Sequence, residues 1–452
     1  MKKIAKFLIV LGMIGQLSSC DYLDIVPDER AQESDTWKTE GAVRGYLYSC
    51  YGYLPANRTF GNSYWLAEEL TAVTKELFTT FKYGYYSPVS LGFTSNTWST
   101  IWNGIHQCYM FQESLKQVSN EYVTDEMKKQ YLAESNFLIA YYHFLSMRSY
   151  GPTMIVRSVI DLETPISGFP ERSSIDEVVA FINEKLDEAM SEGGLPTTWS
   201  GKDYGRATRL AALALKSRVY LYAASPLYNG NTEMYADFRS PLDGRQLIAQ
   251  EKSQAKWEIS ATQTKYAIDE VEKAKFHLYH DADAGEPSDA KPGLPNKAQR
   301  RLRYTNIDNQ TGNNPEIIWA DTRNDDYYGI QRRCPPRPTL GGKFAGISMT
   351  NCPTLQTIEA FYTKNGLPIN KDKTFDYDER YEYINAPENC DGNNYEDLVK
   401  YANFTPSSDK VMRLCTDREP RFYAWTTYHN GYFEFGKYNN EEISADPAKR
   451  AI

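Results

Sequence analysis

Long apolar runs are almost absent from this sequence. After residue 14, no segment approaches the ~18 consecutive apolar residues that a membrane-spanning helix requires. The one apolar run, Phe7–Ile14, follows a lysine-rich start, and as a helix it would rise only ~12 Å, against ~30 Å for a bilayer core. A positive start and a short apolar core are typical of a secretory signal. The sequence therefore predicts an exported chain, with residues 1–19 as the signal peptide.

Positive charge is also in short supply. The chain has 50 Lys and Arg against 59 Asp and Glu, a formal net charge of −9 at pH 7. Binding to a phosphate backbone requires a basic face, so this balance argues against nucleic acid as a partner. Export argues the same way.

Cysteine is scarce, with seven residues among 452, and no two of them have the CxxC spacing of zinc or redox sites. The first, Cys20, ends the motif LSSC, which is typical of a lipobox. In such a motif the cysteine is diacylated and becomes the new N-terminus, and several acyl chains give stable anchoring. We therefore expect lipidation at Cys20 and a tether over residues 20–35. The alternative is a secreted protein with a cysteine near the cut.

The other cysteines could form disulfides in an exported protein. Cys334 with Cys352, and Cys390 with Cys415, would each close a modest loop in the irregular half of the chain. Both pairs are candidate disulfides.

Helical spacing of apolar residues dominates residues 36–280. Two long helices are expected, over about 97–115 and 124–150, the second with a cap at Thr124 and a stop at Gly151. The connection between them is short, so they should pack antiparallel.

A second pair follows the same plan, with helices expected over 175–190, after a cap at Ser174, and over 206–226. Another helix is expected over 253–276. The arrangement is similar to tetratricopeptide pairs, although no clean repeat of ~34 residues is present. The predicted fold class is therefore mainly α, a tetratricopeptide-like scaffold of helical pairs with a loop-rich, minor-β portion.

Residues 281–452 form the loop-rich portion, because proline, glycine, asparagine and aspartate interrupt them frequently. Short strands are expected at 316–321 (EIIWAD) and 422–428 (FYAWTTY). We expect this portion to pack on the scaffold.

Aromatic residues are abundant, at 14% of the chain with 35 tyrosines, and they are densest between Phe81 and Trp102. Sugar binding uses flat apolar faces beside a few polar groups. The candidate ligand-binding residues here are Tyr83, Tyr85, Tyr86 and Trp98. The competing interpretation is that Trp98 and Trp102 are core residues, since both fit the helical stripe, and it is favoured for Trp102.

A second candidate lies at residues 321–333, where Asp325, Tyr327 and Tyr328 combine polar and aromatic groups. The alternative is a solvated turn. The nearby arginines 332, 333 and 337 would suit uronate or sulfate groups. Trp319, inside the expected strand, should belong to the core.

Catalytic and metal-binding signals are weak. His277 and His280 precede a flexible proline-rich stretch with no other His or Cys near them in the sequence, so a metal is not expected. No Ser, Cys or His arrangement indicates a nucleophile. With 59 acidic residues, carboxylate pairs arise by chance and do not establish a glycosidase. We expect no cofactor and no catalysis.

Several stretches together resemble the SusD/RagB family of nutrient-binding lipoproteins. They occur in the family's order and cover most of residues 17–428, and the ordered set is specific although no single motif is. The stretches are DYLDIVP after Cys20, YLAESNFLIAYYHFLSMRSYGPTMIV, RATRLAALALKSRVYLYAASPLYN, NNPEIIWADTR, PTLQTIEAFYTKNGLPI and DREPRFYAWTTY.

The resemblance implies a lipoprotein on the outer face of the outer membrane. It implies a SusC-like TonB-dependent transporter as partner, to which the protein delivers glycans or sometimes peptides. Asp21 and Asp24 are similar to the acidic signal that directs such lipoproteins to the cell surface. The alternatives are a surface glycoside hydrolase and a lipoprotein that binds peptide or serves only as a scaffold.

One departure concerns the C-terminal region. Family members continue into an alanine-rich helix that completes the scaffold, and this sequence shows no such helix before residue 452. Its absence would expose apolar surface on neighbouring helices.

Overall fold

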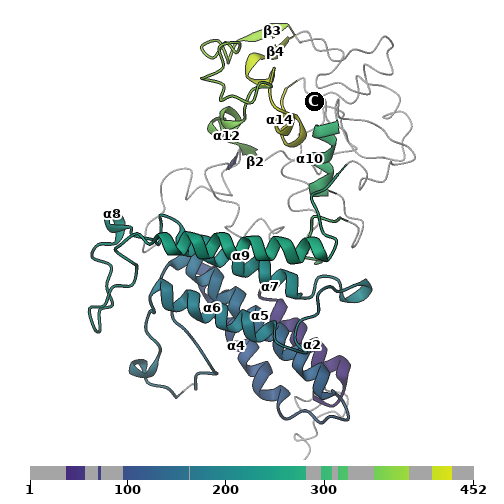
Figure 1. The fold of residues 1–452 in the computed structure, drawn as a ribbon, viewed down its shortest axis with the longest axis vertical. Coiled ribbons are helices and arrows are strands. Elements are labelled where there is room, and N and C mark those ends of the chain that lie inside the picture. Colours follow the sequence, from purple (N-terminus) through teal and green to yellow (C-terminus); the bar gives the residue numbers. More distant parts are fainter. Residues whose placement is uncertain are drawn as a thin grey trace, which may run out of the picture.

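The structure, a computed structural model, has a helical scaffold and a smaller second part (Figure 1). The described residues are 37–55, 70–72, 95–161, 163–280, 297–307, 314–323, 351–385 and 410–429. We use "the scaffold" for the described residues between 37 and 280 other than 70–72. We use "the second part" for 297–307, 351–385 and 410–429, and residues 314–323 lie between the two in sequence.

The scaffold helices pack largely in chain order. They are α2 (Glu40–Tyr51), α4 (Ser95–Leu115), α5 (Asp125–Tyr150), α6 (Ile175–Ala189), α7 (Arg209–Ala224), the short α8 (Thr232–Tyr235) and α9 (Gln254–Lys273). α2 packs on α4, and α4, α5, α6, α7 and α9 each pack on the next (Figure 1). Trp98, early in α4, lies against Tyr150 at the end of α5, so these helices are antiparallel as predicted. The mainly α, tetratricopeptide-like fold class is confirmed.

Side-chain caps explain where the long helices begin. The hydroxyl of Thr124 accepts from the backbone N–H of Met127 at 3.3 Å, and Ser174 forms a capping box with Glu177. α5 ends at Gly151, whose φ of 71° suits glycine, and whose N–H donates to the carbonyl of Met147 at 2.9 Å. The predicted caps at Thr124 and Ser174 and the stop at Gly151 are therefore confirmed.

α5 is the centre of the scaffold core. It packs against α4 and α6 and contacts α2 and α7, and many of its side chains are completely buried. Tyr142 crosses the backbone of α4 at Gly104, where an added Cβ would lie 2.7 Å from the tyrosine ring. Its hydroxyl donates to the carbonyl of Cys50 in α2 at 2.6 Å. One residue of α5 thus joins three helices, and the close approach requires glycine at position 104.

The second part has short elements. Its helices are α10 (Lys297–Ile307), α12 (Leu355–Ala360) and α14 (Pro420–Trp425), and its strands are β2 (Asn351–Pro353), β3 (Tyr383–Asn385) and β4 (Lys410–Met412). Strand β1 (Leu70–Ala72) comes from an earlier part of the chain. β1 pairs antiparallel with β2, and β3 pairs antiparallel with β4. Single 3₁₀ turns occur at Ile166–Gly168, Gly201–Asp203 and Arg413–Cys415.

Polar side chains organise much of the second part. The buried guanidinium of Arg418 donates to the carbonyls of Leu414 at 2.6 Å, and of Ile358 and Phe361 at 2.7 Å each. It also lies 4.8 Å from the centre of the Phe422 ring. Burial lowers the pKa of Arg418. Arg418 therefore ties α12 to the 3₁₀ turn Arg413–Cys415 through backbone groups, and it contacts α14 through the Phe422 ring.

The two expected strands are not formed. Residues 316–321 follow an irregular path fixed by side chains, with Glu316 accepting from the N–H of Tyr279 at 2.9 Å. Residues 422–425 belong to α14, since Pro420 suits the first turn of a helix and overrides the β propensity of the aromatic residues. Hydrophobic composition alone gave the wrong element in both places.

The expected disulfides are also absent, because Cys352 and Cys415 hold free thiols. Cys415 is buried in the second part, where burial raises its pKa to about 12. The Cys415 thiol is therefore packed in the interior as an apolar group and does not form a disulfide. Cys334 and Cys390 lie outside the described residues.

α9 is the last helix of the stack and exposes apolar side chains. Ile259, Tyr266 and Ile268 are each more than two-fifths exposed. No helix among the described residues is both long enough and apolar enough to cross a membrane.

Candidate functional site

The sequence-predicted site residues fall mostly on parts of the chain that are not described. Cys20 and the ligand candidates Tyr83, Tyr85, Tyr86, Asp325, Tyr327 and Tyr328 all lie outside the described residues. Their roles stay predictions, and the structure bears on them only through the residues that flank them.

Trp98 is the exception. It is partly buried near the start of α4, with its ring centre 5.0 Å from that of Tyr150 and 5.4 Å from that of Trp102. Trp102 packs against the main core, edge-on to the buried His143 at 5.8 Å. Trp102 is thus a core-packed residue, as favoured from the sequence, whereas Trp98 lies at the margin of the same aromatic group.

Arg323 joins two stretches of the chain that are far apart in the sequence. Its guanidinium donates to the carbonyls of Leu54 at 2.9 Å and Pro55 at 3.0 Å. Asp321 holds the same guanidinium through both carboxylate oxygens, at 2.8 and 2.7 Å, and this pairing raises the pKa of Arg323. Residues 54–55 end a described stretch of the chain, and residues 321–323 begin the second candidate segment, so these two parts of the chain meet at Arg323.

A second tie joins the same segments further along. Strand β1 lies within the stretch that separates Pro55 from α4, and β2 follows the second segment. The two strands pair in register, with Leu70 opposite Pro353 and Ala72 opposite Asn351. Two chain regions about 270 residues apart are therefore joined twice. We call the ties at Arg323 and at β1–β2 the paired junction.

The paired junction rests on an ordered part of the scaffold. Trp319 donates its indole N–H to the carbonyl of Gly205 at 2.8 Å, and its ring lies edge-on to Phe137 and Tyr141 at 5.0 and 5.4 Å. Trp319 is partly buried and packs against the core, as expected from the sequence, although it does not lie in a strand.

A buried ion pair stabilises the same region. Glu134 of α5 is completely buried and accepts from the guanidinium of Arg206, which also pairs with Asp203 at 2.8 Å. The hydroxyl of Tyr51 donates to Glu134 at 2.6 Å and accepts from the N–H of Ala207 at 2.9 Å. Burial raises the pKa of Glu134. Burial alone would lower the pKa of Arg206, but its hydrogen bonds to Glu134 and Asp203 outweigh burial and raise it. These groups satisfy one another, so they position the chain rather than await a ligand.

A small cavity of about 30 Å³ lies where residues 317–320 meet residues 197–208. Trp199, Arg206 and Trp319 are among its lining residues, and the Arg206 guanidinium lies 4.0 Å from the centre of the Trp199 ring. Ligand pockets usually enclose ~300 Å³ or more. This cavity suits a water molecule and is too small for a sugar ring.

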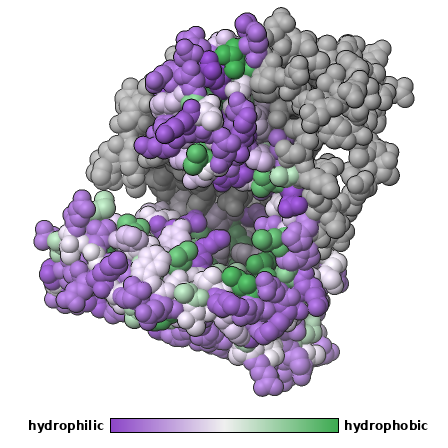
Figure 2. Space-filling view, turned by 45° about the horizontal axis from the view of Figure 1, so that its top comes forward, coloured by the Kyte–Doolittle hydropathy of each residue, from purple (hydrophilic) through white to green (hydrophobic). Residues whose placement is uncertain are grey.

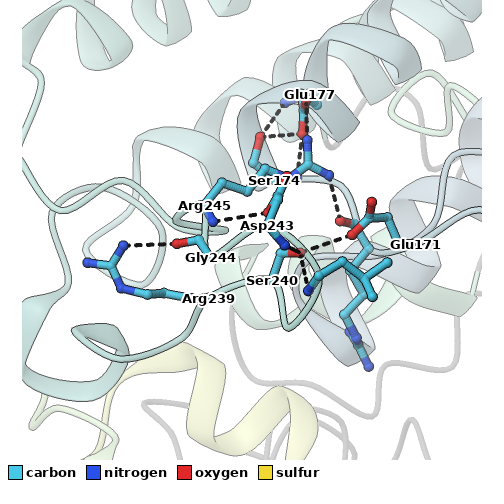
Figure 3. A network of polar contacts seen from close by, with 10 residues as sticks. Glu171, Ser174, Glu177, Arg239, Ser240, Asp243, Gly244 and Arg245 are labelled. Atoms are coloured by element: carbon cyan, nitrogen blue, oxygen red, sulfur yellow. Dashed lines mark hydrogen bonds and ion pairs between the residues drawn. The ribbon is translucent and has the colours of Figure 1, made fainter.

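A polar network fastens the loop between α7 and α9 to the start of α6 (Figure 3). The hydroxyl of Ser240 donates to Glu171 at 2.9 Å, and the guanidinium of Arg245 pairs with Glu177 at 3.2 Å. Hydrogen bonds from Ser174 hold the pKa of Glu177 below its usual range. Because these groups largely bind each other, the network fixes the loop.

Chemical groups for catalysis are few in the described part of the chain. Within that part, no group of three or more His, Cys, Asp or Glu could hold a metal ion. His277 and His280 stack with ring centres 5.5 Å apart.

Figure 2 shows hydrophobic residues along the side of the scaffold that faces the second part. The sequence did not indicate Arg323 as the tie at this side of the molecule. The adjacent Asp321 was the available signal, because an Asp-x-Arg pair in a loop can hold a guanidinium in place.

Comparisons with known families give two matches. Residues 21–221 match the model of SusD-like proteins described as starch-binding and associating with the outer membrane, and residues 315–449 match the SusD family model. No curated protein matches the chain.

Solved structures give the same fold. The protein BT4246 is 30% identical with a TM-score of 0.68, over 88% of this chain and 66% of that one. A SusD-like protein (BF3747) from Bacteroides fragilis NCTC 9343 is 20% identical with a TM-score of 0.57, over 87% of this chain and 61% of that one. The chain thus spans less than two thirds of the length of either.

Proposed function

Because this chain belongs to the SusD/RagB family, we propose that it captures a glycan at the cell surface and delivers it to a SusC-like TonB-dependent transporter. A lipid on Cys20, after removal of residues 1–19, anchors it to the outer membrane through the tether 20–35. The region 36–280 provides the scaffold and 281–452 the loop-rich portion. The protein binds its ligand without chemical turnover.

The paired junction is the observation that carries this proposal. Glycan binding uses several aromatic faces that converge on one saccharide, with polar groups around them. Arg323 and the β1–β2 pair draw together the chain regions that flank the two aromatic-rich segments, although these are far apart in sequence. Tyr83, Tyr85, Tyr86, Asp325, Tyr327 and Tyr328 thereby become candidates for one site rather than two, with Trp98 as a further candidate.

The direct test removes two of the tyrosines. Tyr85→Ala with Tyr86→Ala should weaken binding to the glycan ligand identified on a glycan array by ~10-fold or more, since stacking of a sugar on an aromatic ring is lost. The thermal midpoint should stay nearly unchanged. As the matched control, Tyr266→Ala with Tyr383→Ala removes two exposed tyrosines elsewhere and should leave binding intact.

Two further measurements separate the alternatives. Release of reducing sugar from the bound glycan would indicate a hydrolase instead. Pull-down from outer membranes should recover a β-barrel transporter, and its consistent absence would contradict the delivery role. Binding that persists unchanged in the double tyrosine variant would contradict the site.

A further inference from the structure

A second aromatic surface lies on the scaffold and is made of residues other than the tyrosines of the predicted site. It is formed where α5 and α7 meet next to Trp319. Its members, which we call the arginine–aromatic patch, are Tyr141, Arg148, Arg218, Leu221, Tyr222 and Trp319.

Buried side chains and a hydrogen bond hold the aromatic rings of the patch in fixed positions. Phe144 is completely buried, and it packs edge-on to Tyr222 at 5.3 Å and next to Tyr141 at 6.4 Å. Trp319 meets Tyr141 edge-on at 5.4 Å, and its indole hydrogen bond to Gly205 fixes its orientation. Tyr141, Tyr222 and Trp319 each remain partly exposed. The patch therefore offers partly exposed, rigidly held aromatic rings to solvent at little conformational cost.

Positive charge borders these rings. The guanidinium of Arg148 lies 5.8 Å from the centre of the Phe144 ring. Burial raises the pKa of Tyr141, and the positive charges of Arg148 and Arg218 partly offset this effect. Arg218 is exposed, and among the described residues it has no ion pair or hydrogen bond. Leu221, one turn further along α7, is half exposed.

Arg218 differs in this respect from several other arginines of the scaffold. The chain carries an excess of acidic residues, and Arg157 is paired with Glu184 and Arg245 with Glu177. An exposed guanidinium without such a partner, beside fixed aromatic rings, can bind an anionic group at low desolvation cost.

We propose that the arginine–aromatic patch binds an acidic sugar, with a uronate carboxylate on Arg218 and the apolar face of the sugar ring against Tyr141 and Tyr222. The inference rests on the proposed glycan-binding function and specifies its ligand as a uronate-containing glycan. A planar guanidinium matches a carboxylate through two parallel hydrogen bonds, and the aromatic rings contact the C–H groups of the sugar. Leu221 extends the apolar contact.

The test compares an acidic and a neutral polymer on the full chain. Affinity electrophoresis with polygalacturonate and with amylose should show binding to polygalacturonate that weakens as salt is raised. Arg218→Gln should weaken polygalacturonate binding by ~10-fold, because a charge-assisted hydrogen bond is lost, and should leave any amylose binding unchanged. Arg239→Gln is the matched control, since Arg239 is also exposed and its guanidinium donates to the carbonyl of Gly244.

The outcomes separate the two proposals. Binding to amylose or another neutral glycan but not to polygalacturonate would overturn this inference and leave the proposed function standing. Binding to no glycan at all would overturn both. Equal weakening by Arg218→Gln and Arg239→Gln, or no weakening by Arg218→Gln, would also overturn the inference, because the charge would then act non-specifically or not at all.

Discussion

The scaffold and the second part are stabilised in different ways. The scaffold buries a continuous set of apolar side chains from consecutive helices, whereas the largest apolar cluster of the second part has only Ile369, Phe375 and Leu414 as buried members. The second part instead depends on polar residues that hold backbone groups, chiefly Arg418, and on Asp372, which accepts from Thr363 at 2.5 Å. The stability of the scaffold is therefore distributed over many packed side chains, while the second part relies on a few individual side chains.

The scaffold also contains a buried ion pair, between Glu134 and Arg206, and removing it should reduce stability more than any other proposed substitution. Glu134→Ala would leave the Arg206 guanidinium buried without its main partner, and should reduce the free energy of unfolding by ~3–5 kcal/mol. Urea denaturation followed by circular dichroism measures this change. The control is Glu113→Ala, near the end of α4, which removes an exposed ion pair with Lys116 three residues further along the chain. It should reduce the free energy of unfolding by less than ~1 kcal/mol. A loss below ~1 kcal/mol for Glu134→Ala would show that apolar packing alone holds the scaffold.

Acid should weaken the scaffold through His143. This histidine is completely buried in α5; its Nδ1–H donates to the carbonyl of Ile139 at 2.8 Å, and its Nε2 accepts from the N–H of Val156 at 3.4 Å. Burial lowers its pKa from 6.5 to about 4. The unfolded chain therefore binds the proton more readily between these values, and stability is full above pH 6.5 and falls as the pH drops toward 4.

The expected loss over that window is on the order of 3 kcal/mol. Unfolding free energies measured across the window should follow this slope in the wild-type protein and lose most of it in His143→Gln. His106→Gln changes an exposed histidine on α4 and should retain the slope. An unchanged slope in His143→Gln would assign the acid sensitivity to other groups.

A smaller and more local effect is expected in the second part. Arg418→Met would leave the carbonyls of Leu414, Ile358 and Phe361 without their donor, at a cost of ~1–3 kcal/mol. Hydrogen exchange should show reduced protection in residues 351–385 and 410–429 with α5 unchanged. Arg421→Met removes an exposed pair with Glu419 and is the control. Loss of protection across the scaffold as well would mean that the two parts unfold together.

The sequence allowed the scaffold to be predicted in some detail, because its signals are local. Thr124 and Ser174 cap their own helices through residues three positions away, and Gly151 ends α5 by its own backbone conformation. The strand predictions failed at 316–321 and 422–428, where contacts with other segments and Pro420 override the apolar composition.

The candidate site was predicted only in part. Its aromatic composition is visible in the sequence, but the paired junction is not, because Arg323 binds carbonyls almost 270 residues earlier in the chain. A carbonyl partner has no side-chain signature, so neither Leu54 nor Pro55 could be identified as one. The arginine–aromatic patch was missed for a similar reason. Tyr141 and Tyr222 each fit an ordinary helical stripe, and only packing brings Tyr141 of α5 next to Arg218 and Tyr222 of α7.

The position of Tyr142 has a mechanical consequence. α2 is the first described helix after the proposed anchor at Cys20, so a pull on the tether would load the fold through α2. Near its N-terminal end Glu40 accepts from Tyr131 at 2.5 Å, and near its C-terminal end Tyr142 binds the carbonyl of Cys50. Both bonds come from α5, so a force on α2 would act on contacts at both of its ends. In an anchored binding protein, α5 would then transmit force from α2 to the rest of the scaffold.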